Sequence, residues 1–201
     1  MKTTATVSAL AAAWLAACAS QGAVPAKVPA APAAQAGYDR TFELQGVTFR
    51  VTCSNASSMN QLSIVPSGLT VGNSPITQEV DGIVTGAEVA DVNSDGSPEI
   101  YVYVQSAGSG SYGTVVAYSA NQKRSLSSIY LPLVSEDPKV SKGYMGHDAF
   151  AVVENRFVQR FPVYKPGDTN ASPTGGTRQL HYKLVPGEAG WVLKLDKVEE
   201  F

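Results

Sequence analysis

The sequence predicts an all-β protein: an antiparallel β-sandwich of about eight strands from which one Gly/Ser loop protrudes. Three observations lead to this fold class. Several short segments alternate apolar and polar residues, as half-buried strands do. Clusters of Gly, Pro, Asn and Asp separate them, and almost no segment after residue 37 shows helical periodicity. With 201 residues, of which 44% are hydrophobic, the chain can bury the core of one domain.

The alternation is clearest at residues 47–51, where Val47, Phe49 and Val51 alternate with polar residues. The expected strands are residues 47–51, 62–64, 83–89, 100–105, 114–118, 129–131, 150–153, 157–164, 180–184 and 191–195. Residues 121–128 predict a short helix or a turn, and residues 136–147 and 165–176 predict loops. Pro162 predicts an edge or a bulge in its strand. Short turns between such strands favour a β-sandwich or a flattened barrel.

The first 17 residues predict a signal peptide of the lipoprotein type. Lys2 precedes a short apolar stretch, residues 7–17, that ends in Leu-Ala-Ala before Cys18. This order resembles the bacterial lipobox, in which the cysteine is lipidated and becomes the new N-terminus. Acyl chains on Cys18 would tether the protein to a membrane in the periplasm. The alternative is an ordinary secretory signal, which would leave a soluble periplasmic protein.

Residues 18–37 predict a tether, because they are rich in Ala and Pro and bury too little apolar surface to fold. The folded domain is therefore expected at residues 38–201. The fate of Cys18 decides that of Cys53. If Cys18 is lipidated, Cys53 is a buried or reactive thiol; if Cys18 is retained without lipid, a Cys18–Cys53 disulfide stays open.

Composition argues against several function classes. The net charge is only −2 and no basic stripe is visible, so nucleic acid is not an expected partner. The two histidines, His147 and His181, form neither a metal cluster nor an evident catalytic pair. The glycines of residues 108–113 spell a dinucleotide fingerprint, but a strand follows where a helix is needed. Neither an enzyme nor a cofactor is predicted.

Residues 91–99 offer two interpretations. Asp91, Asn93, Asp95 and Glu99 occupy positions 1, 3, 5 and 9 of a pattern that resembles calcium loops, with glycine at position 6. The bidentate acid of a helical calcium loop is missing at position 12, where Val102 stands. The favoured interpretation is a tight turn closed by Asn and Asp side chains. The alternative is a calcium-dependent adhesion or carbohydrate-binding module.

The Gly/Ser loop, residues 106–113, has the sequence Ser-Ala-Gly-Ser-Gly-Ser-Tyr-Gly and joins two expected strands. Most hairpin loops are shorter. This one carries a single large side chain, Tyr112, among small residues. A flexible connector is the simplest interpretation of such a composition; an exposed aromatic at the tip favours instead a loop that reaches into a partner.

The residues Ser109, Gly110, Ser111 and Tyr112 resemble the short Ser-Gly-x-Tyr signature of bacterial lysozyme inhibitors. Longer motifs in the same order extend the resemblance to the periplasmic inhibitors of invertebrate-type (i-type) lysozyme. They are residues 90–102, 106–113, 143–148, 160–162 and 167–170. The resemblance covers roughly residue 38 to the C-terminus.

The resemblance implies a non-enzymatic β-sandwich whose loop, Ser109 to Tyr112, enters the active-site cleft of a host i-type lysozyme and so protects bacterial peptidoglycan. It implies no cofactor. It leaves a homodimer open, and the lipobox departs from a purely soluble periplasmic member of the family.

Overall fold

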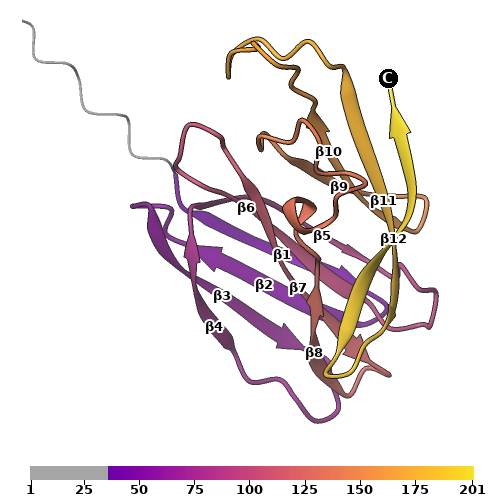
Figure 1. Ribbon diagram of the computed structural model, residues 1–201. Coiled ribbons are helices and arrows are strands. Elements are labelled where there is room, and N and C mark those ends of the chain that lie inside the picture. Colours follow the sequence, from indigo (N-terminus) through magenta and orange to yellow (C-terminus); the bar gives the residue numbers. More distant parts are fainter. Residues whose placement is uncertain (1–35) are drawn as a thin grey trace, which may run out of the picture. The chain divides into compact units, whose positions relative to one another are not determined.

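The structure, a computed structural model, describes residues 36–201 (Figure 1). Strands and one short 3-10 helix, η1 (Val134–Glu136), make up its regular structure. The strands are β1 (Tyr38–Leu44), β2 (Val47–Cys53), β3 (Met59–Ser67), β4 (Ile76–Asp81), β5 (Ile83–Ala90), β6 (Glu99–Gln105), β7 (Gly113–Asn121), β8 (Ser125–Tyr130), β9 (Ala149–Val153), β10 (Arg156–Pro162), β11 (Thr177–Pro186) and β12 (Trp191–Glu200). The all-β prediction is confirmed. The described residues contain no helix long and apolar enough to cross a membrane.

The first four strands form an antiparallel sheet in the order β1-β2-β3-β4. Strand β2 shows why: its odd-numbered residues from Val47 to Cys53 are buried, while the threonines and Arg50 between them are partly or fully exposed. This period of two places one face of the sheet against the rest of the domain.

The other eight strands form one sheet in the order β5-β6-β7-β8-β12-β11-β10-β9. All its pairings are antiparallel except that of β8 with β12, a short parallel ladder at Ile129 and Tyr130. The sheet curls until its first and last strands approach, where the Val152 N–H donates to Glu88 Oε2 at 3.0 Å. It is therefore a nearly closed barrel, and the prediction of a sandwich or flattened barrel is confirmed.

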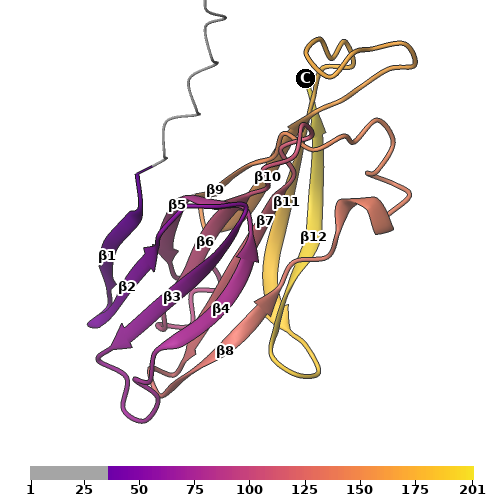
Figure 2. The same ribbon diagram turned by 90° about the vertical axis from the view of Figure 1, so that its left-hand side faces the viewer.

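Strand β6 lies between the four-stranded sheet and strands β10 to β12 (Figure 2). Its side chains enter two cores. Ile100, Val102 and Val104 pack towards the four-stranded sheet. Tyr101 and Tyr103 point the other way, into a second core lined by β9 to β12. Six of the seven β6 residues are buried, so neither face of the strand is exposed to solvent. Its residues 100–104 accordingly form a continuous apolar run.

The passage from the first sheet to the second is a single residue, Gly82, between β4 and β5. Its φ of +123° suits glycine, and an added Cβ would lie 2.1 Å from the Gln105 carbonyl oxygen. Asn55 covers the edge of β5 beside it: its amide donates to the Val84 carbonyl and accepts from the Val84 N–H, both at 2.9 Å. The Asn55 side chain thus makes the two hydrogen bonds to Val84 that a neighbouring strand would otherwise make.

Some element predictions were wrong. Residues 125–128, expected within a helix or turn, extend β8, and only residues 122–124 make the turn. Strands β1 and β4 were not predicted, because a polar residue interrupts the apolar side of each alternation: Arg40 in β1 and Gln78 in β4. Pro162 ends β10 beyond the last pairing with β9, so it does lie at a free edge on that side.

Candidate functional site

The Gly/Ser loop connects β6 to β7, and its last residue, Gly113, already pairs with Gln105. The Ser106 N–H donates to the Tyr112 carbonyl at 2.9 Å and closes the neck of the loop. Within the loop, the Ser111 N–H donates to the Gly108 carbonyl at 2.9 Å. The loop therefore has a defined turn at its tip and leaves from two strands of the domain's centre.

Two other loops hold the tip. The His147 N–H donates to the Gly110 carbonyl at 2.9 Å and lies 3.2 Å from that of Ser111. Asn170 donates its side-chain amide to the Ser109 carbonyl, and its Oδ1 lies 3.0 Å from His147 Nε2. Because the Asn170 oxygen can only accept, the Nε2 of His147 carries the proton in this contact.

Tyr112 lies at the exposed end of this arrangement, with 47% of its surface accessible. Its ring meets the ring of Tyr144 edge to face, with centroids 5.7 Å apart, and Tyr144 meets Phe161 in the same way at 4.7 Å. Phe161 belongs to the second core. A chain of aromatic contacts thus connects the exposed tyrosine to the interior.

Asp148 binds the base of the loop. Its Oδ2 accepts from the Gly113 N–H and from the Tyr144 hydroxyl, and its Oδ1 accepts from Gln159 Nε2, each at 2.8 Å. Gln159 in turn accepts from the Tyr182 hydroxyl at 3.0 Å. Burial raises the pKa of Asp148 above its usual value, although the three donors act in the opposite direction.

Two glycines allow the loops to approach each other. A Cβ on Gly110 would lie 2.5 Å from a ring carbon of Tyr112, and one on Gly146 would lie 2.2 Å from the Gly110 carbonyl oxygen. Gly146 also has a φ of +85°. Alanine at position 146 would force the tip and its support apart, and alanine at position 110 would displace the Tyr112 ring.

The arrangement presents small side chains and hydroxyl groups on a rigid projection. Ala107, Gly108, Ser109 and Tyr112 are exposed. Asn170 holds Ser109 through the Ser109 carbonyl oxygen, and within residues 36–201 the Ser109 hydroxyl has no partner, so it can donate outward. A narrow tip with outward donors and one aromatic ring suits insertion into a cleft lined with acceptors.

The loop of residues 91–98 is closed by its own side chains. Asp91 accepts from the N–H groups of Asp95 and Gly96, both at 2.9 Å, and from Gln45 Nε2 at 2.8 Å. Asn93 and Asp95 accept further loop N–H groups. These bonds are those of the turn that the sequence favoured.

Glu99 completes that loop from inside the domain. Its carboxylate accepts from the Val92 N–H at 2.8 Å and the Ser119 hydroxyl at 3.1 Å, and its side chain is fully buried. Oxygens of Asp91, Asp95 and Glu99 lie within 4.8 Å of one another. Nothing in the comparisons supports the calcium-dependent module, and calcium binding here stays an alternative prediction.

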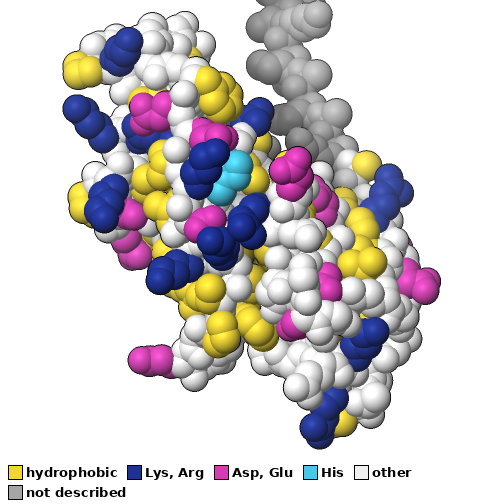
Figure 3. All heavy atoms as spheres, turned by 90° about the vertical axis from the view of Figure 1, so that its right-hand side faces the viewer, with side chains coloured by type: hydrophobic (Ala, Val, Ile, Leu, Met, Phe, Trp, Pro, Cys, Tyr) yellow, Lys and Arg dark blue, Asp and Glu magenta, His cyan; other side chains and the backbone are white. Residues whose placement is uncertain are grey.

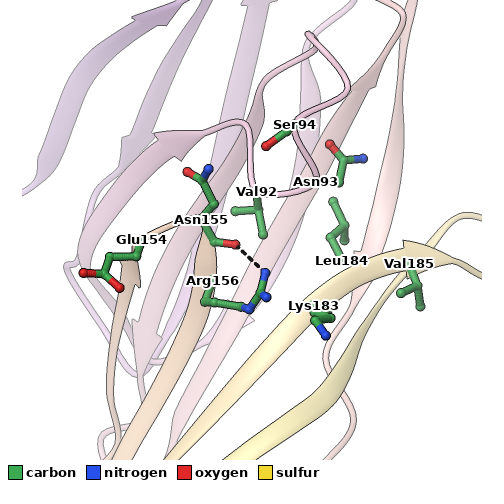
Figure 4. Close-up of a pocket in the computed structure, with 9 residues that line it drawn as sticks. All are labelled: Val92, Asn93, Ser94, Glu154, Asn155, Arg156, Lys183, Leu184 and Val185. Atoms are coloured by element: carbon green, nitrogen blue, oxygen red, sulfur yellow. Dashed lines mark hydrogen bonds between the residues drawn. The ribbon is translucent and has the colours of Figure 1, made fainter.

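Two further groups of charged side chains among the described residues lie away from the Gly/Ser loop. On one face, Lys, Arg, Asp and Glu side chains intermix around a histidine (Figure 3). His181 pairs with Glu199 at 2.9 Å, and Glu199 also pairs with Lys197. A cavity of about 410 Å³ is lined by the 91–98 loop, the turn between β9 and β10, and strands β10 and β11 (Figure 4). Its cations, Arg156 and Lys183, both pair with Asp196.

The structure brings together residues that the sequence singled out only as parts of motifs. Tyr144, His147 and Asp148 come from the motif at 143–148, and Asn170 comes from that at 167–170. Sequence reasoning gave none of them a role, and it treated His147 as ordinary. Their one signal was membership of motifs that accompany the Gly/Ser loop. Cys18 lies outside the described residues; Cys53 is buried and has no disulfide partner within residues 36–201.

Comparison with known proteins bears on this loop directly. The family model described as periplasmic lysozyme inhibitor of I-type lysozyme matches residues 75–134. The matched segment runs from β4 to η1 and contains the 91–98 loop and the Gly/Ser loop. No curated protein matches the chain. Residues 75–134 therefore carry the pattern of the periplasmic inhibitors of i-type lysozyme. The match confirms the resemblance over this segment, which holds the motifs at 90–102 and 106–113; the motifs after residue 134 lie outside it.

Proposed function

We propose that this protein inhibits a host i-type lysozyme by inserting Ser109, Gly110, Ser111 and Tyr112 into the active-site cleft, and so protects bacterial peptidoglycan. The protein binds and does not catalyse. The observation that carries the proposal is the loop itself: a supported projection with an exposed tyrosine, within the segment that matches the inhibitor family.

The chemistry of the target fits such a tip. Glycosidases work with a pair of carboxyl groups in a groove. The hydroxyls of Ser109 and Tyr112 can donate to these acceptors, and a hydrogen bond to a charged group contributes about 1.5–3 kcal/mol. The Tyr112 ring adds apolar area, and tyrosine is a frequent hot-spot residue. The glycines let the backbone approach the cleft walls.

The test compares inhibition of a purified i-type lysozyme by the parent and two variants. Tyr112→Ala should weaken binding by about thirtyfold or more, the loss of a central hot-spot tyrosine. Ser109→Ala should weaken it less, by about tenfold, the equivalent of one hydrogen bond. The change should appear in the dissociation rate, because neither variant alters the charge that steers association.

Tyr130 offers a matched control, since it is also an exposed tyrosine, with 54% of its surface accessible, but belongs to β8. Tyr130→Ala should inhibit like the parent. All variants should melt within a few degrees of it, because surface changes shift stability by only about 0.5 kcal/mol. If Tyr112→Ala is folded and inhibits as well as the parent, the loop is a connector and the proposal is wrong.

We further propose that the protein acts in the periplasm on a lipid anchor at Cys18. The family is periplasmic by description, and the lipobox before Cys18 supports the anchor. A soluble periplasmic form remains the alternative if Cys18 carries no lipid.

A further inference from the structure

We propose that Asp148 is the positioning residue of the Gly/Ser loop: it holds the loop and Tyr112 in the conformation that binds lysozyme without itself touching the partner. This inference rests on the proposed function of the loop.

The first argument is where the bonds of Asp148 go. One carboxylate oxygen accepts both from the N–H of Gly113, the last residue of the loop, and from the Tyr144 hydroxyl. The Tyr144 ring supports Tyr112 edge to face. A single oxygen atom therefore fixes the backbone at which the loop ends and the aromatic ring against which Tyr112 rests.

The second argument is that Asp148 is itself anchored. Its other oxygen accepts from Gln159 on β10, and Gln159 accepts from the Tyr182 hydroxyl on β11. Gln159 and Tyr182 are buried. The carboxylate is thus fixed to two strands of the second core. Through it, the end of the loop is connected to the buried part of the barrel.

The third argument is steric. A Cβ on Gly113 would lie 2.6 Å from the Cβ of Asp148 and 2.5 Å from the Phe150 ring. Glycine at 113 therefore allows the backbone to reach the carboxylate directly. A loop ordered before binding loses less conformational entropy when it enters a cleft, which strengthens binding without any new contact.

The experiment measures affinity for a purified i-type lysozyme with Asp148→Ala, alone and combined with Tyr112→Ala. Asp148→Ala should weaken binding by about tenfold or more, since it removes bonds to a charged acceptor. In the Tyr112→Ala background the same change should have little further effect, because its influence passes through Tyr112. A purely structural role would give independent, multiplicative losses, and that result overturns the inference.

Asp91→Ala is the matched control. Asp91 also accepts three hydrogen bonds, at 2.8–2.9 Å, but its loop precedes β6 whereas the Gly/Ser loop follows that strand. Both variants should melt at a lower temperature than the parent. Only Asp148→Ala should lose affinity once the folded fraction is equal. Equal losses of affinity in the two variants overturn the inference.

Two conservative variants extend the test if Asp148→Ala does not fold. Asp148→Asn keeps an oxygen for Gly113 and Tyr144, and the Gln159 amide can turn to meet the new donor; its affinity should stay within about threefold of the parent. Tyr144→Phe removes one of the three bonds and keeps the ring. It should weaken binding a few-fold and speed amide exchange at Gly113; unchanged affinity and exchange overturn the inference.

The outcomes separate the inference from the function on which it rests. If Tyr112→Ala inhibits like the parent, the proposed role of the loop fails and the inference falls with it. If Tyr112→Ala weakens inhibition while folded Asp148→Ala inhibits like the parent, the proposed function stands and the positioning role of Asp148 is refuted.

Discussion

Glu99 is a fully buried acidic residue whose environment favours the neutral form. Burial raises the pKa of Glu99 from its usual 4.5 to about 7, and the nearby Asp91 and Asp95 add to this, while the donors Val92 and Ser119 oppose it. The folded protein therefore keeps this proton at pH values where the unfolded chain has lost it. The contribution of Glu99 to stability is present below about pH 4.5 and is lost as the pH rises to about 7.

The Glu99→Gln variant should remove this pH dependence. Glutamine can accept from Val92 and donate to Ser119, so the packing is kept. Against the parent it should be equally stable near pH 4 and more stable at pH 8 by up to about 3 kcal/mol, at 1.36 kcal/mol per pKa unit. Urea unfolding of both proteins across this range measures the difference. A difference that stays constant with pH contradicts the assignment.

The same titration examines calcium binding at residues 91–99. A bound cation would hold the Glu99 carboxyl group ionised and suppress the pH dependence of the parent. Because the loop oxygens already accept hydrogen bonds, we expect millimolar calcium to leave the parent's stability curve unchanged. A clear stabilisation by calcium, absent in Asp91→Ala, would restore the metal alternative.

At the scale of elements, the edge of β5 depends on one buried side chain. Asn55→Ala would leave both the N–H and the carbonyl of Val84 without their partner. Because Asn55 is only 7% exposed, water cannot easily replace it. The free energy of unfolding should fall by roughly 2–6 kcal/mol, at 1–3 kcal/mol for each of the two unsatisfied groups.

Asn73 supplies the control for this prediction. Its amide makes the same pair of bonds to Leu69, in the loop between β3 and β4, but Asn73 is exposed. Water can take over those bonds, so Asn73→Ala should lower stability by less than about 1 kcal/mol. Thermal or urea unfolding of the two variants side by side makes the comparison; similar losses in both would show that burial is not the deciding factor.

The strands that could be predicted from the sequence are those in which the pattern of apolar and polar residues matches the pattern of buried and exposed positions. Residues 47–51 alternate because one face is buried, and residues 100–104 of β6 are all apolar or aromatic because both faces are. Strand β1 could not be predicted in this way, since it is an outer strand with four of seven residues exposed. Its position follows from pairing with β2, which is a tertiary property.

The candidate site also has a part that could be predicted from the sequence and a part that could not. Tyr112 stands out in the sequence because it is the one large side chain among Gly and Ser. The support could not be predicted, because Asp148 lies 35 residues from its partner Gly113, and Asn170 lies 61 residues from Ser109. Such contacts are created by the barrel, which returns β9, β10 and the loop after β10 to the end of β6.

At the scale of the whole protein, the proposed lipid anchor at Cys18 predicts where the protein is found. We expect full-length protein expressed in bacteria to incorporate labelled palmitate and to fractionate with membranes. Cys18→Ala should lose the label and move to the soluble periplasmic fraction. The inhibition constant of the folded domain should not change, because the lipid contributes nothing to the loop. A Cys18→Ala protein that remains equally membrane-associated would contradict the lipoprotein assignment.

The burial of β6 in both cores has a consequence for how the domain opens. Amides of a strand covered on both faces exchange with solvent only when the domain unfolds globally, whereas outer strands such as β1 and β4 can open locally. The Gly/Ser loop begins at the end of this doubly covered strand. Breathing of the outer strands, and proteolytic nicks that exploit it, should therefore leave the loop's conformation and its affinity for lysozyme intact.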